Sequence, residues 1–226
     1  MKRLVNFNST LPSTPKLRRS LIFDTVILSL QYVLIALLCL AAFALWAFAP
    51  VGIDGNSMQN SYFDGETVIV RKAFATPTRG DVVVIRRSEG YLIKRVVAKG
   101  GDEVGFVEKD GKVYLFVDDG SGFKKVNEPY LKEDMINASN VFIKITPHDS
   151  EEALVKKGGF VVPKDGLYLL GDNRNHSGDS RSYGVFYEKD LYGVVVGKDN
   201  EYKILSSLFS LFYKENAIEK TKGDLK

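Results

Sequence analysis

The hydrophobic pattern divides the chain into one long apolar run and a following region of short apolar segments. Residues 26–48 read VILSLQYVLIALLCLAAFALWAF and contain no charge, with Ser29 and Gln31 as the clearly polar positions. At about 1.5 Å per residue, a helix of this length reaches roughly 35 Å, enough to cross a hydrocarbon core of about 30 Å. Because backbone groups in lipid must be hydrogen-bonded internally, the run predicts a single transmembrane helix.

A retained anchor explains this run better than two alternatives. A buried helix of a soluble core is seldom so long, and a cleaved secretory signal has an apolar region of about 7–15 residues followed by small residues. Here the run ends in bulky Trp46 and Phe48 before Pro50. The sequence therefore predicts a cytoplasmic tail over residues 1–20 and a transmembrane anchor over residues 21–50.

The charges that flank the anchor predict its orientation. All charged side chains of the tail are basic, whereas the first charged side chains after the anchor are acidic: Asp54, Asp64 and Glu66. The positive-inside rule then places the N-terminus in the cytoplasm and the chain beyond Val51 outside. Trp46 fits an aromatic belt at the outer interface. The basic residues of the tail are Lys2, Arg3, Lys16, Arg18 and Arg19.

Beyond Pro50 the apolar positions fall in short segments rich in β-branched residues. Turn-like stretches, such as residues 75–80 and 88–90, separate them. Short, closely spaced strands with few helical periods predict an antiparallel, mostly β architecture. The expected strands are residues 66–72, 81–86, 91–97, 112–117, 141–145, 167–170 and 192–196.

Changes in charge and hydrophobicity along the exported part predict its division into subdomains. Residues 105–159 are more charged and indicate an inserted β-rich subdomain, which leaves residues 51–104 and 160–200 as the main, catalytic β-domain. The tail over residues 201–226 begins with an apolar stretch, 204–213, that is too short to span a bilayer. This stretch predicts a short amphipathic helix against the membrane surface or the β-domain.

Composition narrows the function classes. A net charge of +3, which includes the basic tail, gives no indication of nucleic-acid binding. The single cysteine, Cys39, lies inside the apolar run, so the exported part has no disulfide. The only histidines are His148 and His176, and no Cys/His cluster has metal-ligand spacing. We therefore expect no metal and no other cofactor.

Three segments carry candidate chemistry. Ser57 follows Gly-Asn just beyond the anchor, and Lys94 alternates with apolar residues in a predicted strand. A serine hydroxyl needs an adjacent base, and a lysine pressed against apolar surface loses its proton more easily. On an edge strand the same lysine would point to solvent. The polar stretch 171–184 directly follows a predicted strand and indicates a functional loop, or else a well hydrogen-bonded turn.

Taken in order, these segments resemble type I signal peptidases, membrane-anchored serine proteases that remove signal sequences from exported proteins. The resemblance covers most of the chain, and the last block matches the family pattern GDNRxxSxDSRxxG at every fixed position. The matching blocks are Gly55-Asn-Ser-Met58, Arg79-Gly-Asp-Val-Val-Val84, Tyr91-Leu-Ile-Lys-Arg-Val-Val97 with Gly101-Asp102, and Gly171-Asp-Asn-Arg-Asn-His-Ser-Gly-Asp-Ser-Arg-Ser-Tyr-Gly184.

The resemblance implies a role for each matching position. Ser57 corresponds to the nucleophile and Lys94 to the general base. Ser177 matches a serine that hydrogen-bonds and orients the base, while Asp179 and Arg181 match a charged pair that supports the site without reacting. The base must be uncharged near pH 7–8, about 2–3 pKa units below free lysine, and an apolar pocket lowers the pKa in that direction.

The same resemblance implies a substrate and a location. The expected substrates are signal peptides of exported pre-proteins, with small side chains one and three residues before the cut, in shallow pockets formed by Ile53, Met58 and Leu92. The backbone N–H of Ser57 is a candidate oxyanion donor, while Gly55 lacks the hydroxyl that some relatives place there. The expected partners are the lipid bilayer and a secretion translocon, at a bacterial cytoplasmic membrane.

The chain departs from the family pattern at two places. The family usually reads Ser-Met-x-Pro-Thr-Leu, whereas this chain reads Ser57-Met-Gln-Asn-Ser-Tyr62. Losing the proline removes a fixed φ, so we expect a looser turn after the nucleophile. In addition, Leu92 stands where an aromatic more often lies two residues before the base.

Three other functions remain open at this point. The first is a Ser-His-Asp hydrolase that uses His176 with Asp172 or Asp179, although the family pattern is variable at the histidine. The second is a self-cleaving Ser-Lys repressor-type protease, but a membrane span takes the place of its DNA-binding domain. The third is an inactive or specialised membrane-tethered relative that binds exported peptides, against which the presence of both Ser57 and Lys94 argues.

Overall fold

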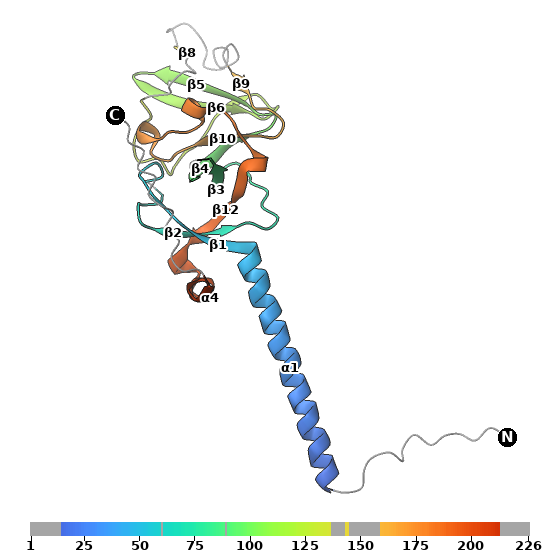
Figure 1. Ribbon diagram of the computed structural model, residues 1–226. Helices are drawn as coiled ribbons and strands as arrows, with labels where there is room; N and C mark the ends of the chain where they lie inside the picture. The colour runs from blue at the N-terminus through green and yellow to red at the C-terminus, as the bar shows by residue number, and fades with distance from the viewer. Residues whose placement is uncertain (1–14, 60, 89, 137–142, 145–158, 213–226) are drawn as a thin grey trace, which may run out of the picture. The chain divides into compact units, whose positions relative to one another are not determined.

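The computed structural model describes residues 15–59, 61–88, 90–136, 143–144 and 159–212, in two compact units, Met1–Leu45 and Trp46–Lys226 (Figure 1). Helix α1 (Pro15–Ala47) contains the segment Ile22–Ala47, which has a mean hydropathy of 2.5 and is long and apolar enough to cross a membrane. Within the described chain, none of its most apolar window is buried, unlike a core helix of a soluble protein.

The predicted anchor over residues 21–50 extends beyond the end of the apolar helix, and its bounds stay a prediction. The helix ends at Ala47, and Phe48–Gly52 form strand β1, which pairs antiparallel with β2 (Thr67–Arg71). The main-chain carbonyl of Ala47 accepts hydrogen bonds from Lys72 N and Ala73 N, at 2.7 and 3.2 Å. These two bonds tie the end of the helix to the loop after β2. The apolar character of β1 made it indistinguishable from the helix in the sequence.

A seven-stranded sheet forms the main part of the second unit as the structure describes it. Its strand order is β1-β2-β12-β3-β4-β10-β11, and every neighbouring pair is antiparallel (Figure 1). The remaining bounds are β3 (Val82–Arg87), β4 (Gly90–Lys99), β10 (Gly166–Leu170), β11 (Phe186–Tyr187) and β12 (Leu191–Lys198).

A second sheet of five described strands comes from the part of the chain where the insertion was expected. Its order is β7-β6-β5-β8, with β9 also pairing with β5, and β8 is the strand that runs parallel to its neighbour. The bounds are β5 (Glu103–Lys109), β6 (Lys112–Asp118), β7 (Phe123–Lys125), β8 (Ile143–Lys144) and β9 (Phe160–Val161).

The two sheets share a hydrophobic core. One cluster combines Ala98 of β4 and Leu170 of β10 with Phe106 of β5 and Leu115 of β6, each at most 1% exposed. Each sheet therefore covers an apolar face of the other. The prediction of a mostly antiparallel β-sheet fold behind an N-terminal apolar helix is confirmed.

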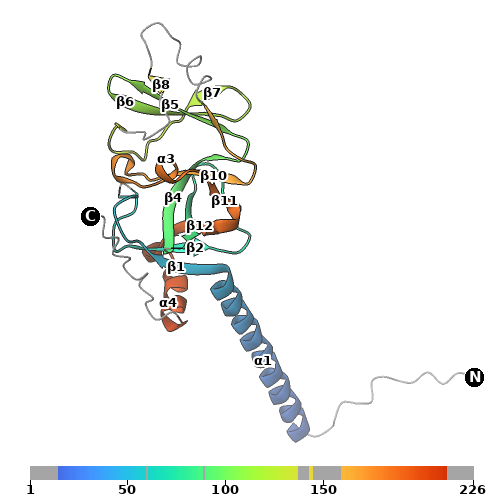
Figure 2. The same cartoon turned by 45° about the horizontal axis from the view of Figure 1, so that its top comes forward.

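The remaining helices are short. Among the described helices, two lie within the stretch 171–184, and α4 follows the last strand, at the end of the β-domain that carries β1 and away from β5 and β6 (Figures 1 and 2). Their bounds are η2 (Arg174–His176), α3 (Ser180–Tyr183), η3 (Glu188–Asp190), η4 (Asp199–Glu201) and α4 (Lys203–Phe212).

Candidate active site

The structure brings Ser57 and Lys94 into direct contact. The Nζ atom of Lys94 lies 2.6 Å from Oγ of Ser57 and 2.8 Å from the main-chain carbonyl oxygen of Ile93. Strand β4 lies between β3 and β10 and is therefore not an edge strand. The Lys94 side chain is 2% exposed and reaches Ser57, so it points into the protein and not to solvent.

Burial prepares Lys94 to act as a base. Loss of solvation lowers its pKa from the ordinary value of 10.5 to about 8, although the negative charges of Asp179 and Asp172 partly oppose the change. The side chain shares its face of the sheet with Val83, its antiparallel neighbour, and Val96, both fully buried. A lysine in this environment has an appreciable uncharged fraction near neutral pH, as a general base requires.

The turn that carries Ser57 is held by the residues that lead into β2. Ile53 N donates to the carbonyl of Glu66, and Gly65 N donates to the carbonyl of Ile53, at 2.8 and 2.9 Å. The carboxylate of Asp64 accepts a hydrogen bond from Gly55 N at 2.8 Å. Gly55 itself has φ +94°, a conformation that favours glycine. Gly55, two residues before Ser57, thus serves the turn and supplies no hydroxyl.

The loop after β10 contacts Ser57 from the other side. Asn173 N donates to the carbonyl oxygen of Ser57 at 3.0 Å, and its side-chain amide donates to the carbonyl of Asn56 at 3.1 Å. Asp172 N also lies 3.4 Å from the sulfur of Met58. The polar stretch 171–184 is therefore a part of the site and not an unrelated turn.

The segment after the nucleophile is anchored where the sequence predicted a looser turn. The hydroxyl of Ser61 donates to the fully buried carboxylate of Asp172. Arg95 binds the same carboxylate with two nitrogens, at 2.8 and 2.5 Å. Ser61 is therefore fixed by its hydroxyl. Residue 60, where the family has proline, lies outside the described chain, so looseness at that position stays a prediction.

Asp179 and Arg181 form a buried ion pair behind the loop. Arg181 donates to both carboxylate oxygens of Asp179 at 2.8 Å, and the same carboxylate accepts from Gly171 N at 3.0 Å. Burial alone would raise the pKa of Asp179, but the hydrogen bonds and charge of Arg181 outweigh it and hold that pKa below its usual range. Arg181 also donates to the carbonyl of Arg174, so the pair supports the backbone of the loop.

Neither Ser177 nor His176 forms a hydrogen bond with the pair of Ser57 and Lys94 in the described structure, but Ser177 is buried and His176 is exposed. The hydroxyl oxygen of Ser177 is buried against Gly171, and it makes no hydrogen bond to Lys94 in the described structure. The orienting role of Ser177 therefore stays a prediction. His176 is exposed, and no hydrogen bond joins its side chain to Ser57 within the described residues. The geometry does not assemble a Ser-His-Asp arrangement.

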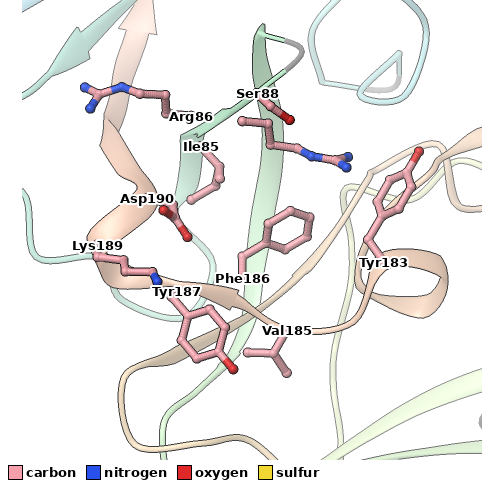
Figure 3. Close-up of a pocket in the computed structure, with 10 residues that line it drawn as sticks. Ile85, Arg86, Ser88, Tyr183, Val185, Phe186, Tyr187, Lys189 and Asp190 are labelled. Atoms are coloured by element: carbon pink, nitrogen blue, oxygen red, sulfur yellow. The ribbon is translucent and has the colours of Figure 1, made fainter.

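The three predicted pocket residues do not gather in one cluster. Ile53 packs with Ile93, whereas Leu92 packs with Ile85 and Phe186 on the opposite face of β4. Met58 is fully buried beneath the loop. Ile85 and Phe186 are among the residues that line a cavity of about 450 Å³, whereas Ser57 and Lys94 do not line it (Figure 3).

Contacts from the segment that follows β7 were not predicted from the sequence. Arg174 is 3% exposed and binds the carboxylate of Glu128 at 2.9 and 2.5 Å. The ring of Tyr130 lies under the guanidinium of Arg95, 4.1 Å from it. The side-chain oxygen of Asn175 accepts from Ile136 N at 3.0 Å. Residues 126–136, which continue from β7, therefore brace the loop, a relation that no local sequence signal reveals.

Gly171 sits where a larger residue would disturb both halves of the site. A Cβ atom on Gly171 would lie 2.1 Å from Oγ of Ser177 and 2.5 Å from the carbonyl oxygen of Ser57. We expect Gly171→Ala to lower kcat/KM by about 10²-fold, because a shift near 1 Å misplaces the nucleophile. Gly52→Ala is the matched control, since a Cβ there meets nothing within 4 Å. Equal activity of the two variants in a peptide-cleavage assay would refute the packing argument.

Comparison with known proteins identifies the family. The family described as signal peptidase, peptidase S26, matches residues 26–198 of this chain. Signal peptidase I P of Bacillus subtilis subsp. natto is 34% identical over 187 residues, which cover 79% of this chain and 89% of that protein. Signal peptidase I of Bacillus amyloliquefaciens is 31% identical over 179 residues, which cover 77% and 81% of the two chains.

A solved structure was also matched. The crystal structure of a signal peptidase I from Enterococcus faecalis aligns with a TM-score of 0.34 and 22% identity, covering 54% of this chain and 98% of that one. The family assignment depends on the sequence matches alone. The chain belongs to the type I signal peptidase family.

Proposed function

We propose that the protein cleaves signal peptides from exported pre-proteins, with Ser57 as nucleophile and Lys94 as general base. The observation that carries this proposal is the 2.6 Å contact between Nζ of a 2% exposed lysine and Oγ of Ser57. Family membership supports the substrate class, and the contact supports the roles of Ser57 and Lys94. A buried lysine beside a serine has the form of an activated nucleophile.

In the first half of the reaction, uncharged Lys94 takes the hydroxyl proton of Ser57 as Oγ attacks the carbonyl carbon of the scissile peptide bond. The negative charge of the tetrahedral intermediate falls on the former carbonyl oxygen, for which the backbone N–H of Ser57 is a candidate donor. The ammonium of Lys94 then returns the proton to the leaving amine, which becomes the N-terminus of the mature protein. The signal peptide remains as an ester on Ser57.

The second half mirrors the first. Lys94 takes a proton from a water molecule, which attacks the ester, and then gives the proton back to Oγ of Ser57. Both halves need Lys94 to change charge, and its pKa of about 8 permits both states near neutral pH. Asp179, Arg181 and Ser177 support this exchange by holding the loop against the nucleophile, Ser177 as the residue that orients the base.

The membrane anchor determines which substrates are reached. We infer that residues 22–47 span a bacterial cytoplasmic membrane once, with the N-terminus in the cytoplasm and the β-domain outside. Signal peptides enter the same bilayer, so a tethered site meets them at a raised effective concentration without additional contacts. Ile53, Met58 and Leu92 remain the proposed pocket residues for the small side chains before the cut, and a translocon remains a candidate partner.

The decisive experiment compares wild type with Ser57→Ala on a pre-protein in lipid vesicles. We expect wild type to release a mature protein whose N-terminus follows a small residue, and Ser57→Ala to release none. The alternative function, a tethered domain that only binds exported peptides, predicts equal binding and no cleavage by either protein. Absence of cleavage by wild type on several pre-proteins would favour that alternative.

A further inference from the structure

Helix α4 carries apolar residues around almost half of its circumference. With 3.6 residues per turn, its polar side chains fall on one side and its apolar side chains on the other. The polar ones are Lys203, Ser206, Ser207 and Ser210, and the apolar ones with described environments are Ile204, Leu205, Leu208, Phe209 and Leu211.

The β-domain covers only one edge of this apolar side. Phe209 is 2% exposed and Leu205 is half-buried, so this edge packs against the domain. At the other edge, Ile204 is 88% exposed and Leu211 is 78% exposed. These two residues lie two turns apart on the same line of the helix and flank half-buried Leu208. Together with Leu208 they form a narrow apolar stripe, the outer edge of α4, whose two ends are open to solvent.

A second uncovered apolar residue lies in the loop after β2. Phe74 is 82% exposed and has φ +51°, a left-handed conformation that is unfavourable for a bulky side chain by roughly 1–3 kcal/mol. Arg71 holds this conformation by donating to the carbonyl of Phe74 at 2.8 Å. The loop is thus built to present a phenyl ring outward, where it contributes nothing to the core.

Both features lie beside the point where the chain leaves the apolar helix. Trp46, in the last turn of α1, meets the ring of Phe74 edge-on at 6.1 Å. Helix α4 contacts β1, which begins at Phe48, and both views show it at this end of the β-domain (Figures 1 and 2). Phe74 and α4 therefore lie at the end of the β-domain where the apolar segment enters it.

We propose that Phe74 and the outer edge of α4 form a second membrane contact, inserted into the interfacial layer of the bilayer that the anchor crosses. An amphipathic helix buries its apolar face about 5–10 Å into this layer, and Lys203 beside the stripe suits anionic headgroups. The inference rests on the proposed anchor. It predicts that the β-domain is attached at two places, which restricts its rotation about α1 and holds the site at a constant height.

The test uses tryptophan fluorescence, because Trp46 is the only tryptophan of the chain. In the full-length protein with Trp46→Phe, a single tryptophan is introduced in turn by Phe74→Trp, Leu211→Trp, Phe43→Trp and Phe160→Trp. Phe43 lies in the anchor and Phe160 in β9 of the second sheet. Each variant is reconstituted into vesicles that contain lipids brominated in the upper part of the acyl chain.

We expect tryptophans at positions 74, 211 and 43 to lose about half or more of their emission, since bromine quenches only on close approach, and position 160 to lose none. Quenching at position 43 alone would overturn the second contact and leave the anchor intact. No quenching at any position would overturn both. A blue-shifted but unquenched tryptophan at position 211 would show that a second protein copy, and not lipid, covers α4.

Cleavage of a pre-protein by the same vesicles separates this inference from the proposed function. Active vesicles without quenching at positions 74 and 211 would leave the peptidase intact and remove only the second contact. Quenching at positions 74 and 211, together with no cleavage by vesicles of the wild-type protein, would instead remove the proposed function and retain the membrane contact.

Discussion

Lys94→Met is expected to lower kcat/KM for pre-protein cleavage by about 10²–10⁴-fold, because it removes the base that activates Ser57. Methionine fills a similar volume, so the apolar surroundings of the side chain stay packed. Lys94→Arg is expected to fail equally, since a guanidinium keeps its proton at all relevant pH values. His176→Ala is the control and should retain activity, because His176 is exposed and makes no contact with Ser57 in the described structure.

The pH profile of the wild type follows from the same lysine. Because the uncharged form is the base and the pKa of Lys94 is about 8, kcat/KM should rise with pH through that value and then level off. A flat profile between pH 6 and 10, or full activity of Lys94→Met, would contradict the assignment of the base. Activity lost only in His176→Ala would replace the dyad by a histidine mechanism.

The lysine also has a measurable effect on stability. Its pKa is about 8 in the folded protein and 10.5 when solvated, so the unfolded chain binds more protons between these values and stability rises with pH across this interval. Below pH 8 the buried charge costs about 3 kcal/mol. Lys94→Met should therefore exceed wild type in free energy of unfolding at pH 7, and this difference should shrink toward pH 10.5.

The sequence predicted those parts of the fold that local patterns control. Most of the longer strands were expected because segments rich in β-branched residues alternate with turn signals. Most of α1 was expected because the charge-free apolar run over residues 26–48 is long enough to span a membrane. Strand β1 was missed because Phe48–Gly52 is as apolar as the helix before it. What separates the two is pairing with β2, and that pairing depends on residues far along the chain.

Within the site, the order of motifs indicated the dyad, but only the fold determines the state of Lys94. A central strand can still expose side chains: in β4, Tyr91 is 41% exposed, whereas Lys94 is 2% exposed. The packing around Lys94 decides this point, and its contact with Ser57 joins residues 37 positions apart. The fixed position of Ser61 could not be predicted from the local sequence either, because its contact with Asp172 joins residues 111 positions apart.

The contact between Glu128 and Arg174 links the second sheet to the active-site loop, and its removal should produce the largest loss of stability. Glu128→Ala leaves the guanidinium of Arg174, 1% exposed at its side chain, without its charged partner. Breaking such a buried pair costs about 3–5 kcal/mol, because a buried charge remains uncompensated. Cleavage should fall as well, since Arg174 also donates to the carbonyl of Gly171, beside Ser57.

Two comparison variants make this expectation specific. Asp134→Ala breaks the exposed pair with Lys112 in the same segment and should change the free energy of unfolding little. The double variant Glu128→Leu, Arg174→Met removes both charges and should recover much of the stability lost by Glu128→Ala, because no buried charge is left unpaired. Chemical unfolding of all three variants in detergent provides the measurement. If Glu128→Ala proves no more harmful than Asp134→Ala, the second sheet does not brace the loop through this pair, and its support of the site must come from the shared apolar core.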